Sequence, residues 1–307
     1  MIRTTLLVTA VLWALAATAS AECTCATPGC TGHTSWQSGS WRLVQTANFR
    51  VCVLATEAEA LSLAISCEQL RGHLCDKWLG PFGVDAAVQT WSPKCYVVVH
   101  PTAESYLREV GPGQQTAGSS LIELGTQSVA ARRIDLRADH PEGYRDALAH
   151  EMTHVVVAER FVERQIPRWA DEGMAVLADS QAKQLAHLVD LHDAHHRGRT
   201  FRLAELFALQ EYPTPDQQAV FYGQSISLAK YLVERGSAEQ FVRFVELATH
   251  SGYDTAARSV YGFESVGDLE RQWRVHLASP RARMASDDKP PSRNTPLIGR
   301  QVSLVRQ

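Results

Sequence analysis

Hydrophobic and polar residues follow different spacings in the two halves of the chain. In the first half, apolar residues alternate over residues 41–54 and run without interruption over residues 95–99, patterns that indicate β-strands. Between them, apolar residues recur at helical spacing over residues 57–79, and a Gly-Pro pair ends this predicted helix. The first half therefore combines strands with a long helix.

A β-hairpin is predicted to close this half. Residues 119–124 and 128–136 form its two strands, with a Gly-Thr pair at the turn between them. A short helix over residues 102–110, with Thr102 as its N-terminal cap, is expected before the hairpin.

From residue 144 onward, apolar residues recur at helical spacing. The sequence therefore predicts an α+β fold, with a small mixed β-sheet in the N-terminal half and helices in the C-terminal half. The expected helices span residues 143–160, 168–181, 182–197, 203–209, 218–235, 238–249 and 265–278.

The sequence HEMTH at residues 150–154 lies on the first of these helices. His150 and His154 are four residues apart, so both imidazoles lie on one face of the helix, where a zinc ion could accept them as ligands. Glu151 is rotated by about 100° from His150. It is therefore out of line with the two histidines, but it can reach a water molecule beside the metal and act as a general base.

A catalytic zinc ion needs three protein ligands and one open position. Glu172 lies far enough beyond His154 for the chain to turn and begin a second helix, and Pro167 stands where a helix start tolerates proline. Asp171 is an alternative ligand, although helix capping or a hydrogen bond to a ligand is the role that we favour for it.

The two motifs together resemble those of the gluzincin metallopeptidases and, among these, the bacterial peptidase MA-like domains. The resemblance spans about residues 41–278 and is carried by ALAHEMTHVVVAERF, IPRWADEGMAVLAD and FYGQSISLAKYLVE. It implies a zincin-like fold with the site at the seam between the two halves. It also implies one Zn²⁺ per chain, held by His150, His154 and Glu172, and a peptide or protein substrate.

Three features depart from the family pattern. The gap from His154 to Glu172 is slightly shorter than in thermolysin-like or aminopeptidase relatives. No G-x-M-x-N strand precedes the zinc helix, so the amine-recognition device of the aminopeptidases is not visible. Val176 occupies the place of the thermolysin-like carboxylate one turn after the third ligand, so the sequence leaves the orientation of the histidines open.

The resemblance also suggests an oxyanion donor. Gluzincins often have a tyrosine or histidine that donates a hydrogen bond to the oxyanion, and Tyr222 is the candidate here. The alternative is a tyrosine packed between helices, with its hydroxyl satisfied locally.

A gluzincin substrate lies along an edge strand as an added β-strand. The strand over residues 128–136 is nearest to the zinc helix in sequence, and we expect it to be that edge. Arg132, Arg133 and Arg137 could then select acidic substrates, or they could be solvated charges that block edge-to-edge aggregation.

Export is indicated by residues 1–21, which have a basic start, a short apolar core and an Ala-Ser-Ala cleavage site. The mature chain would then have no stable membrane span; an uncleaved N-terminal anchor is the alternative. Export makes disulfides reasonable, and because the cysteine number is odd, at least one thiol is free or pairs between chains. An N-terminal Cys-x-Cys-x4-Cys metal site is a less favoured alternative. The seven cysteines are Cys23, Cys25, Cys30, Cys52, Cys67, Cys75 and Cys95.

The expected organisation is a signal peptide, a Cys-rich arm, a catalytic domain and a disordered tail. Their ranges are 1–21, 22–40, 41–279 (halves 41–141 and 142–279) and 280–307. The tail has four prolines and six basic residues, and attraction to a membrane or cell wall is an alternative to simple solvation.

Composition and charge narrow the function further. The formal net charge is −3 and no basic stripe is present, so nucleic acid is not an expected partner. His192 and His196 are four apart and could bind a second metal, but nearby Asp190 and Asp193 favour a solvated face. The sequence predicts an exported zinc peptidase, with an exported zinc-containing peptide- or cell-wall-binding domain of little or no activity as the alternative. It does not indicate an oligomeric state.

Overall fold

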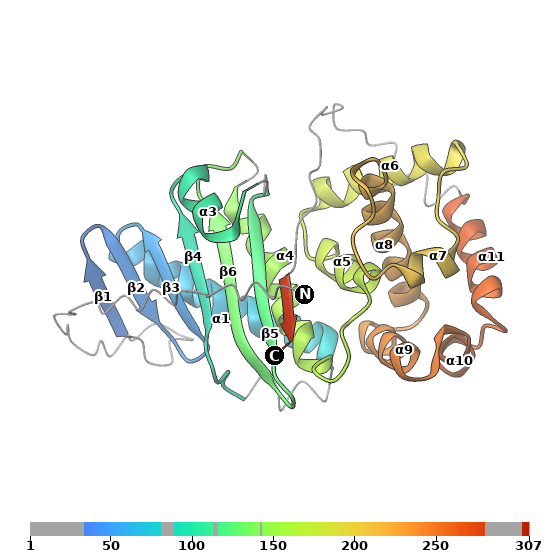
Figure 1. Ribbon diagram of the computed structural model, residues 1–307, viewed down its shortest axis with the longest axis horizontal. Coiled ribbons are helices and arrows are strands. Elements are labelled where there is room, and N and C mark those ends of the chain that lie inside the picture. Colours follow the sequence, from blue (N-terminus) through green and yellow to red (C-terminus); the bar gives the residue numbers. More distant parts are fainter. Residues whose placement is uncertain (1–33, 81–88, 113–115, 142, 280–302, 307) are drawn as a thin grey trace, which may run out of the picture.

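The fold is known from a computed structural model. A mixed β-sheet is followed by a helical half, so the predicted α+β fold is confirmed. In Figure 1 the sheet and the helical half lie at opposite ends, with helix α4 (Tyr144–Val157) between them. The residues that the structure describes are 34–80, 89–112, 116–141, 143–279 and 303–306.

The described strands form one mixed sheet. In chain order they are β1 (Thr34–Ser38), β2 (Trp41–Gln45), β3 (Phe49–Leu54), β4 (Cys95–His100), β5 (Gly118–Leu124), β6 (Val129–Arg137) and β7 (Ser303–Arg306). Their order across the sheet is β1-β2-β3-β4-β6-β5-β7. The first three strands form an antiparallel meander, and β3, β4 and β6 are parallel to one another. The predicted hairpin is confirmed, because β5 is antiparallel to β6.

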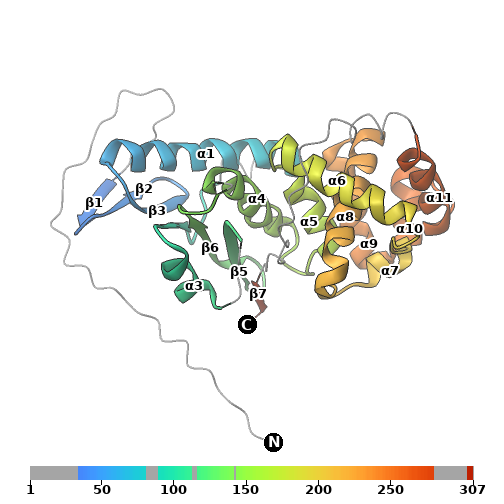
Figure 2. The same ribbon diagram turned by 90° about the horizontal axis from the view of Figure 1, so that it is seen from above.

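Helices cover both faces of the sheet. Helix α1 (Glu57–Leu79) lies with α4 on one face, and α3 (Ala103–Val110) lies on the other (Figure 2). At the start of α1, Glu59 donates its amide to the Thr56 hydroxyl at 3.3 Å and accepts from the Thr56 amide at 2.9 Å. This reciprocal cap fixes the beginning of the helix where the sequence predicted it.

The helical half contains the predicted helices. One of them ends early, and a short helix with a π-helical segment after it (Ala257–Tyr261) was not predicted. The helix expected over residues 168–181 ends at Val176, and a short helix near residue 253 is additional. None of the helices in the described ranges is long and apolar enough to cross a membrane. The helices are α5 (Arg168–Val176), α6 (Gln181–His196), α7 (Leu203–Ala208), α8 (Pro215–Arg235), α9 (Ala238–Ser251), α10 (Tyr253–Ala256) and α11 (Val266–Leu277).

The prediction of one strand over residues 41–54 is wrong, because the chain folds back within it to form β2 and β3. The carboxylate of Glu68 on α1 holds this turn. It accepts hydrogen bonds from the Thr46 hydroxyl at 2.6 Å and from the amide and side-chain nitrogens of Asn48 at 2.7 and 2.6 Å. Strand β1 lies within the Cys-rich arm, for which the sequence predicted no strand.

The prediction that residues 128–136 form the sheet edge is also wrong. Strand β6 is interior, because it pairs with β4 on one side and with β5 on the other. Two of its arginines form hydrogen bonds and ion pairs with other residues of the chain. Arg132 is buried, donates to the Pro93 carbonyl at 2.8 Å and pairs with Glu159, while Arg133 makes two 2.8 Å bonds to Asp135. Selection of acidic substrates by an edge strand therefore loses its basis.

The tail was expected to be disordered, but Ser303–Arg306 form strand β7, which pairs in parallel with β5. The remainder of the expected tail, residues 280–302, lies outside the described residues, as do the predicted signal peptide and the first three cysteines.

The described cysteines, Cys52, Cys67, Cys75 and Cys95, have free thiols, so the expected disulfides are not found among them. Cys67 and Cys95 are fully buried, and burial raises the pKa of both thiols. They therefore remain neutral and act as small apolar side chains in the core.

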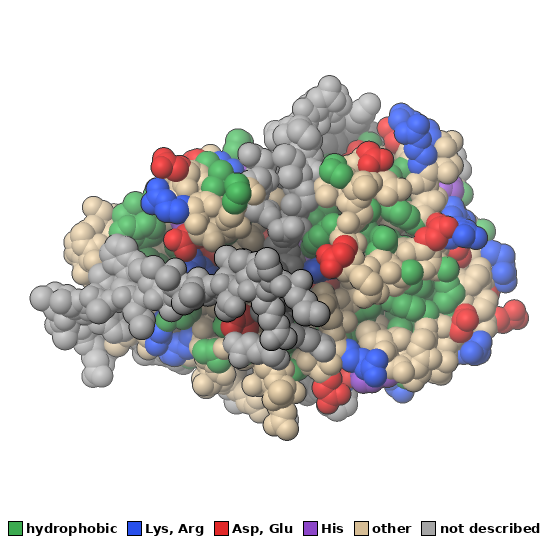
Figure 3. All heavy atoms as spheres, in the orientation of Figure 1, with side chains coloured by type: hydrophobic (Ala, Val, Ile, Leu, Met, Phe, Trp, Pro, Cys, Tyr) green, Lys and Arg blue, Asp and Glu red, His purple; other side chains and the backbone are tan. Residues whose placement is uncertain are grey.

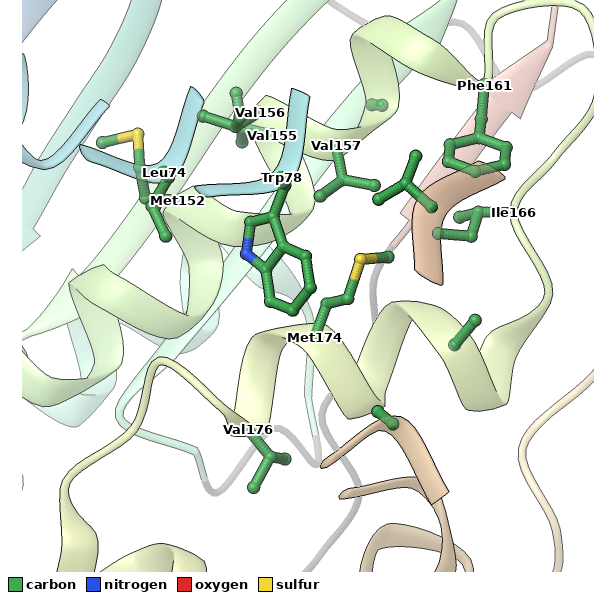
Figure 4. Packing of buried hydrophobic residues seen from close by; sticks show 14 of the residues in the cluster. Leu74, Trp78, Met152, Val155, Val156, Val157, Phe161, Ile166, Met174 and Val176 are labelled. Carbon is green, nitrogen blue, oxygen red and sulfur yellow. The ribbon is translucent and has the colours of Figure 1, made fainter. Parts of the chain in front are cut away.

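One hydrophobic cluster extends through both halves of the molecule. In Figure 4, Trp78 of α1 and Met174 of α5 lie in the space between α1, α4 and α5, close to Val157. Trp78 is completely buried, and its ring centroid is 6.3 Å from that of Phe241 on α9. These contacts fix the position of the helical half relative to the sheet. On the face seen in Figure 3, acidic and basic side chains are interspersed, and hydrophobic side chains gather over the helical half.

The close approach of α5 to α8 depends on Gly173. A Cβ atom at this position would lie 2.6 Å from the Ser225 carbonyl oxygen and 2.9 Å from the Ala229 Cβ. We predict that Gly173→Ala lowers the free energy of unfolding by about 1–3 kcal/mol, the typical cost of overpacking a core.

Denaturant unfolding of the two chains measures this change, with Gly72→Ala as the matched control. A Cβ at Gly72 on α1 meets no atom within 4 Å, so this second substitution should stabilise the helix by about 0.5–1 kcal/mol. Equal effects of the two substitutions would show that the α5–α8 contact does not constrain residue 173.

Candidate metal centre

Two consecutive helices bring the predicted ligands together. His150 and His154 lie on α4 and Glu172 lies on α5, and all three side chains are at most 1% exposed. One ligand atom from each residue lies within 4.8 Å of the other two. The Nε2 atom of His150 is 3.5 Å from the Oε2 atom of Glu172. The three side chains thus converge on one point.

The connection between the helices explains this convergence. Helix α4 ends in a short 3₁₀ turn (Ala158–Arg160), and the chain then reaches Pro167, whose carbonyl accepts hydrogen bonds from the amides of Ala170 at 2.9 Å and Asp171 at 3.1 Å. These bonds begin α5 immediately after the proline. Glu172 therefore lies in the first turns of the helix, next to the last turns of α4.

Two carboxylates set the orientation of the histidine rings. The Nδ1 atom of His154 is 2.7 Å from Asp171 Oδ1, and the Nδ1 atom of His150 is 3.1 Å from Asp179 Oδ2. Because a carboxylate only accepts, each histidine donates through Nδ1 and presents Nε2 as the ligand atom. This arrangement answers the question that Val176 left open in the sequence.

Asp171 thus contacts a ligand, the role that the sequence favoured over direct coordination. Asp179 was not predicted. It lies beyond the end of α5, is nearly buried, and also accepts a 3.3 Å bond from Lys183. The only sequence signal for Asp179 was its position seven residues after Glu172. That spacing does not by itself predict a contact with His150, because the contact depends on the path of the chain after Val176.

The donor atoms fit a metal ion. The His154 Nε2 and Glu172 Oε2 atoms are buried and have no hydrogen-bond partner among the described residues. Buried polar atoms nearly always have a partner, and a cation held between these two atoms would supply one. Two imidazoles and one carboxylate are a known ligand set of catalytic zinc, with a fourth position left open.

The charges around the ligands also favour a cation. Burial alone would lower the pKa of His154, but the Asp171 carboxylate outweighs burial and, with Glu172 and Glu151, raises this pKa to about 9. Burial alone would raise the pKa of Glu172, but the adjacent His150 ring, whose Nε2 atom is 3.5 Å from Glu172 Oε2, and the charges of the two histidines lower it. The carboxylates therefore make the centre electronegative, which stabilises positive charge there.

Glu151 lies beside the ligands and faces the sheet. It is 1% exposed, and its Oε2 atom accepts a 2.9 Å hydrogen bond from the Ser120 hydroxyl on β5. A Cβ atom at Gly118, also on β5, would lie only 3.0 Å from Glu151 Cγ. Strand β5, and not β6 as the sequence suggested, is therefore the strand next to the centre.

One tyrosine, Tyr212, contacts a candidate ligand, and the tyrosine that the sequence suggested, Tyr222, lies beside it. Tyr222 is buried on α8, with its ring centroid 5.5 Å from that of His187 and 6.5 Å from that of Tyr212. Tyr212, in the segment before α8, donates its hydroxyl to Glu172 Oε1 at 2.5 Å. Nothing in the local sequence distinguishes Tyr212, because its contact depends on the path of the chain after α7. The oxyanion role of Tyr222 stays a prediction.

The histidine cluster on α6 does not form a second centre of this kind. The ring centroids of His192 and His196 are 5.2 Å apart. Within the described part of the chain, however, the one group of three residues that could hold a metal consists of His150, His154 and Glu172.

The comparison with known families indicates a metallopeptidase-like domain. Residues 130–279, from β6 to the end of the helical half, match the family model described as the peptidase MA superfamily. The family resemblance seen in the sequence is therefore confirmed over the segment that holds the candidate ligands. Among the curated proteins, none matches the chain.

Removal of Asp179 tests how the histidines are oriented. We predict that Asp179→Ala weakens zinc binding by about 10- to 100-fold, because the His150 ring loses the partner that fixes it. Competition with a chromogenic chelator measures the affinity.

Asp193→Ala is the matched control, because Asp193 is an exposed carboxylate on α6 that pairs only loosely with Arg197, at 3.8 Å. Equal zinc affinities of the Asp179→Ala chain and the wild type would contradict the orienting role.

Proposed function

We propose that this chain is an exported zinc-dependent peptidase that hydrolyses bonds in peptide or protein substrates. The observation that carries the proposal is the convergence of His150, His154 and Glu172 beside Glu151, within the segment that matches the peptidase MA superfamily. Export rests on the sequence of residues 1–21.

His150, His154 and Glu172 would hold one Zn²⁺. When bound, the ion would supply Lewis acidity, polarising a scissile carbonyl and lowering the pKa of water. Asp171 and Asp179 hold the histidines in the tautomer that this requires, through bonds of 2.7 and 3.1 Å. Tyr212 holds the other carboxylate oxygen of Glu172.

Glu151 is the proposed general base. Its carboxylate accepts a proton from the attacking water molecule and then delivers it to the leaving amine. The Ser120 hydroxyl fixes one of its oxygens from the sheet side, at 2.9 Å. Because Glu151 is buried, its proton transfers are shielded from bulk water. Tyr222 is the proposed donor to the oxyanion.

Glu151→Gln separates an enzyme from a zinc-containing binding domain. The substitution is nearly isosteric and removes the basic carboxylate, so zinc content and thermal stability should be retained. We predict that hydrolysis of a broad peptide mixture falls by at least about 100-fold, the lower range for a positioned acid–base group.

The two chains are compared at matched zinc occupancy, with a chelator as the blank. Equal chelator-sensitive rates would falsify the role of Glu151. No cleavage by the wild type across the mixture would favour the binding domain.

The two tyrosines should respond differently to removal of their hydroxyls. Tyr222→Phe is predicted to lower kcat by about 100- to 1,000-fold with unchanged zinc affinity, because an oxyanion donor is lost. Tyr212→Phe should weaken zinc binding, because Glu172 loses the hydrogen bond that orients it. If Tyr212→Phe lowers kcat at normal zinc affinity while Tyr222→Phe changes nothing, the oxyanion role belongs to Tyr212.

A further inference from the structure

The strand next to the metal centre is already covered by a distant segment of the chain. Strand β5 pairs with β6 along one side and with β7 along the other. In Figures 1 and 2, β7 lies beside β5, on the side of the sheet that faces the helical half. Over residues 121–124, both edges of β5 are therefore paired within the chain, whereas the register with β7 does not include residues 118–120.

The pairing begins next to Glu151. The register joins Leu121 to Ser303 and continues to Leu124 and Arg306. Ser120, the residue before Leu121, is the one whose hydroxyl donates to Glu151. Neighbouring strands lie about 4.8 Å apart. Strand β7 therefore lies directly beside β5, starting one residue after the serine that contacts the proposed general base.

An extended peptide substrate would need the same hydrogen-bonding edge of β5. A peptide that adds to a sheet edge binds through the N–H and C=O groups of the edge strand. On β5 those groups face β7, because the opposite groups face β6. A substrate strand and β7 therefore cannot both pair with residues 121–124 of β5 at the same time.

The sequence of the segment suits reversible occupancy. Residues 280–302 contain four prolines, whereas residues 303–306 contain none, so each amide of β7 can donate. Four residues make few hydrogen bonds, and a free peptide of this length would bind weakly. The covalent tether raises the local concentration of β7, which makes weak pairing effective within one chain.

We propose that β7 is an internal occupant of the β5 edge and inhibits the metal centre by excluding extended peptide substrates. Cleavage then requires β7 to be displaced or removed. This inference rests on the proposed peptidase function, whereas the occupancy of β5 by β7 can be measured without any activity.

The test compares the mature chain with a variant that ends at Val302. A control variant lacks residues 284–288, so it loses the same length of chain but keeps β7. Hydrogen exchange of β5 should be faster in the variant that ends at Val302 than in the other two chains. A fluorescent peptide of residues 300–307 should bind that variant, and a scrambled peptide should not. At matched zinc occupancy, its kcat/KM for extended peptides should rise at least about threefold, as expected when the local concentration of β7 is a few times its Kd.

The outcomes are distinct. Unchanged exchange and no peptide binding would overturn the occupancy of β5 and the inhibition with it. Faster exchange with an unchanged kcat/KM would overturn the inhibition alone. Zinc- and Glu151-dependent loss of residues 303–307 from the mature chain, detected by mass spectrometry, would make the segment a substrate and refute the inhibitory role. Peptide binding with no cleavage by any of the three chains would refute the proposed peptidase, while the occupancy of β5 would stand.

Discussion

The hydrogen bonds from the two histidines to Asp171 and Asp179 are the contacts on which the arrangement of the centre depends. They fix both rings, but they form only if α5 and the turn after it lie against α4. The position of α5 in turn requires the close contact of Gly173 with α8 and the apolar packing around Trp78. A polar arrangement of a few atoms is therefore supported by the packing of the whole helical half.

The two halves contribute different parts of the centre. The helical half orients the candidate ligands, through Asp171, Asp179 and the Tyr212 hydroxyl. The sheet positions Glu151, through Ser120 and the close approach of Gly118. A relative displacement of the halves would separate Ser120 and Gly118 on β5 from Glu151, which lies on α4 with the two histidines. The shared hydrophobic core opposes such a displacement, since separating the halves would expose apolar surface to water.

The sequence predicted the features that depend on local spacing. The i, i+4 histidines and the boundaries of α1 follow from helical periodicity, and Glu172 was recognised by its motif. Features set by distant contacts were missed. The turn between β2 and β3 depends on Glu68, twenty residues away. The hairpin was predictable from the sequence. Which of its two strands lies in the interior of the sheet was not predictable, because this depends on which of them pairs with β4. Asp179 and Tyr212 reach the centre from irregular segments, where periodicity carries no information.

The place of β7 in the chain affects the order in which the molecule is built. Synthesis proceeds from the N-terminus, and domains fold as their chains emerge. Both halves and every candidate ligand precede residue 280, whereas β7 follows at residues 303–306. The β5 edge is therefore complete before its cover exists, and during that interval it is open to any extended chain nearby. Until β7 is present, residues 121–124 of β5, the strand beside the candidate metal centre, therefore have no partner on that side.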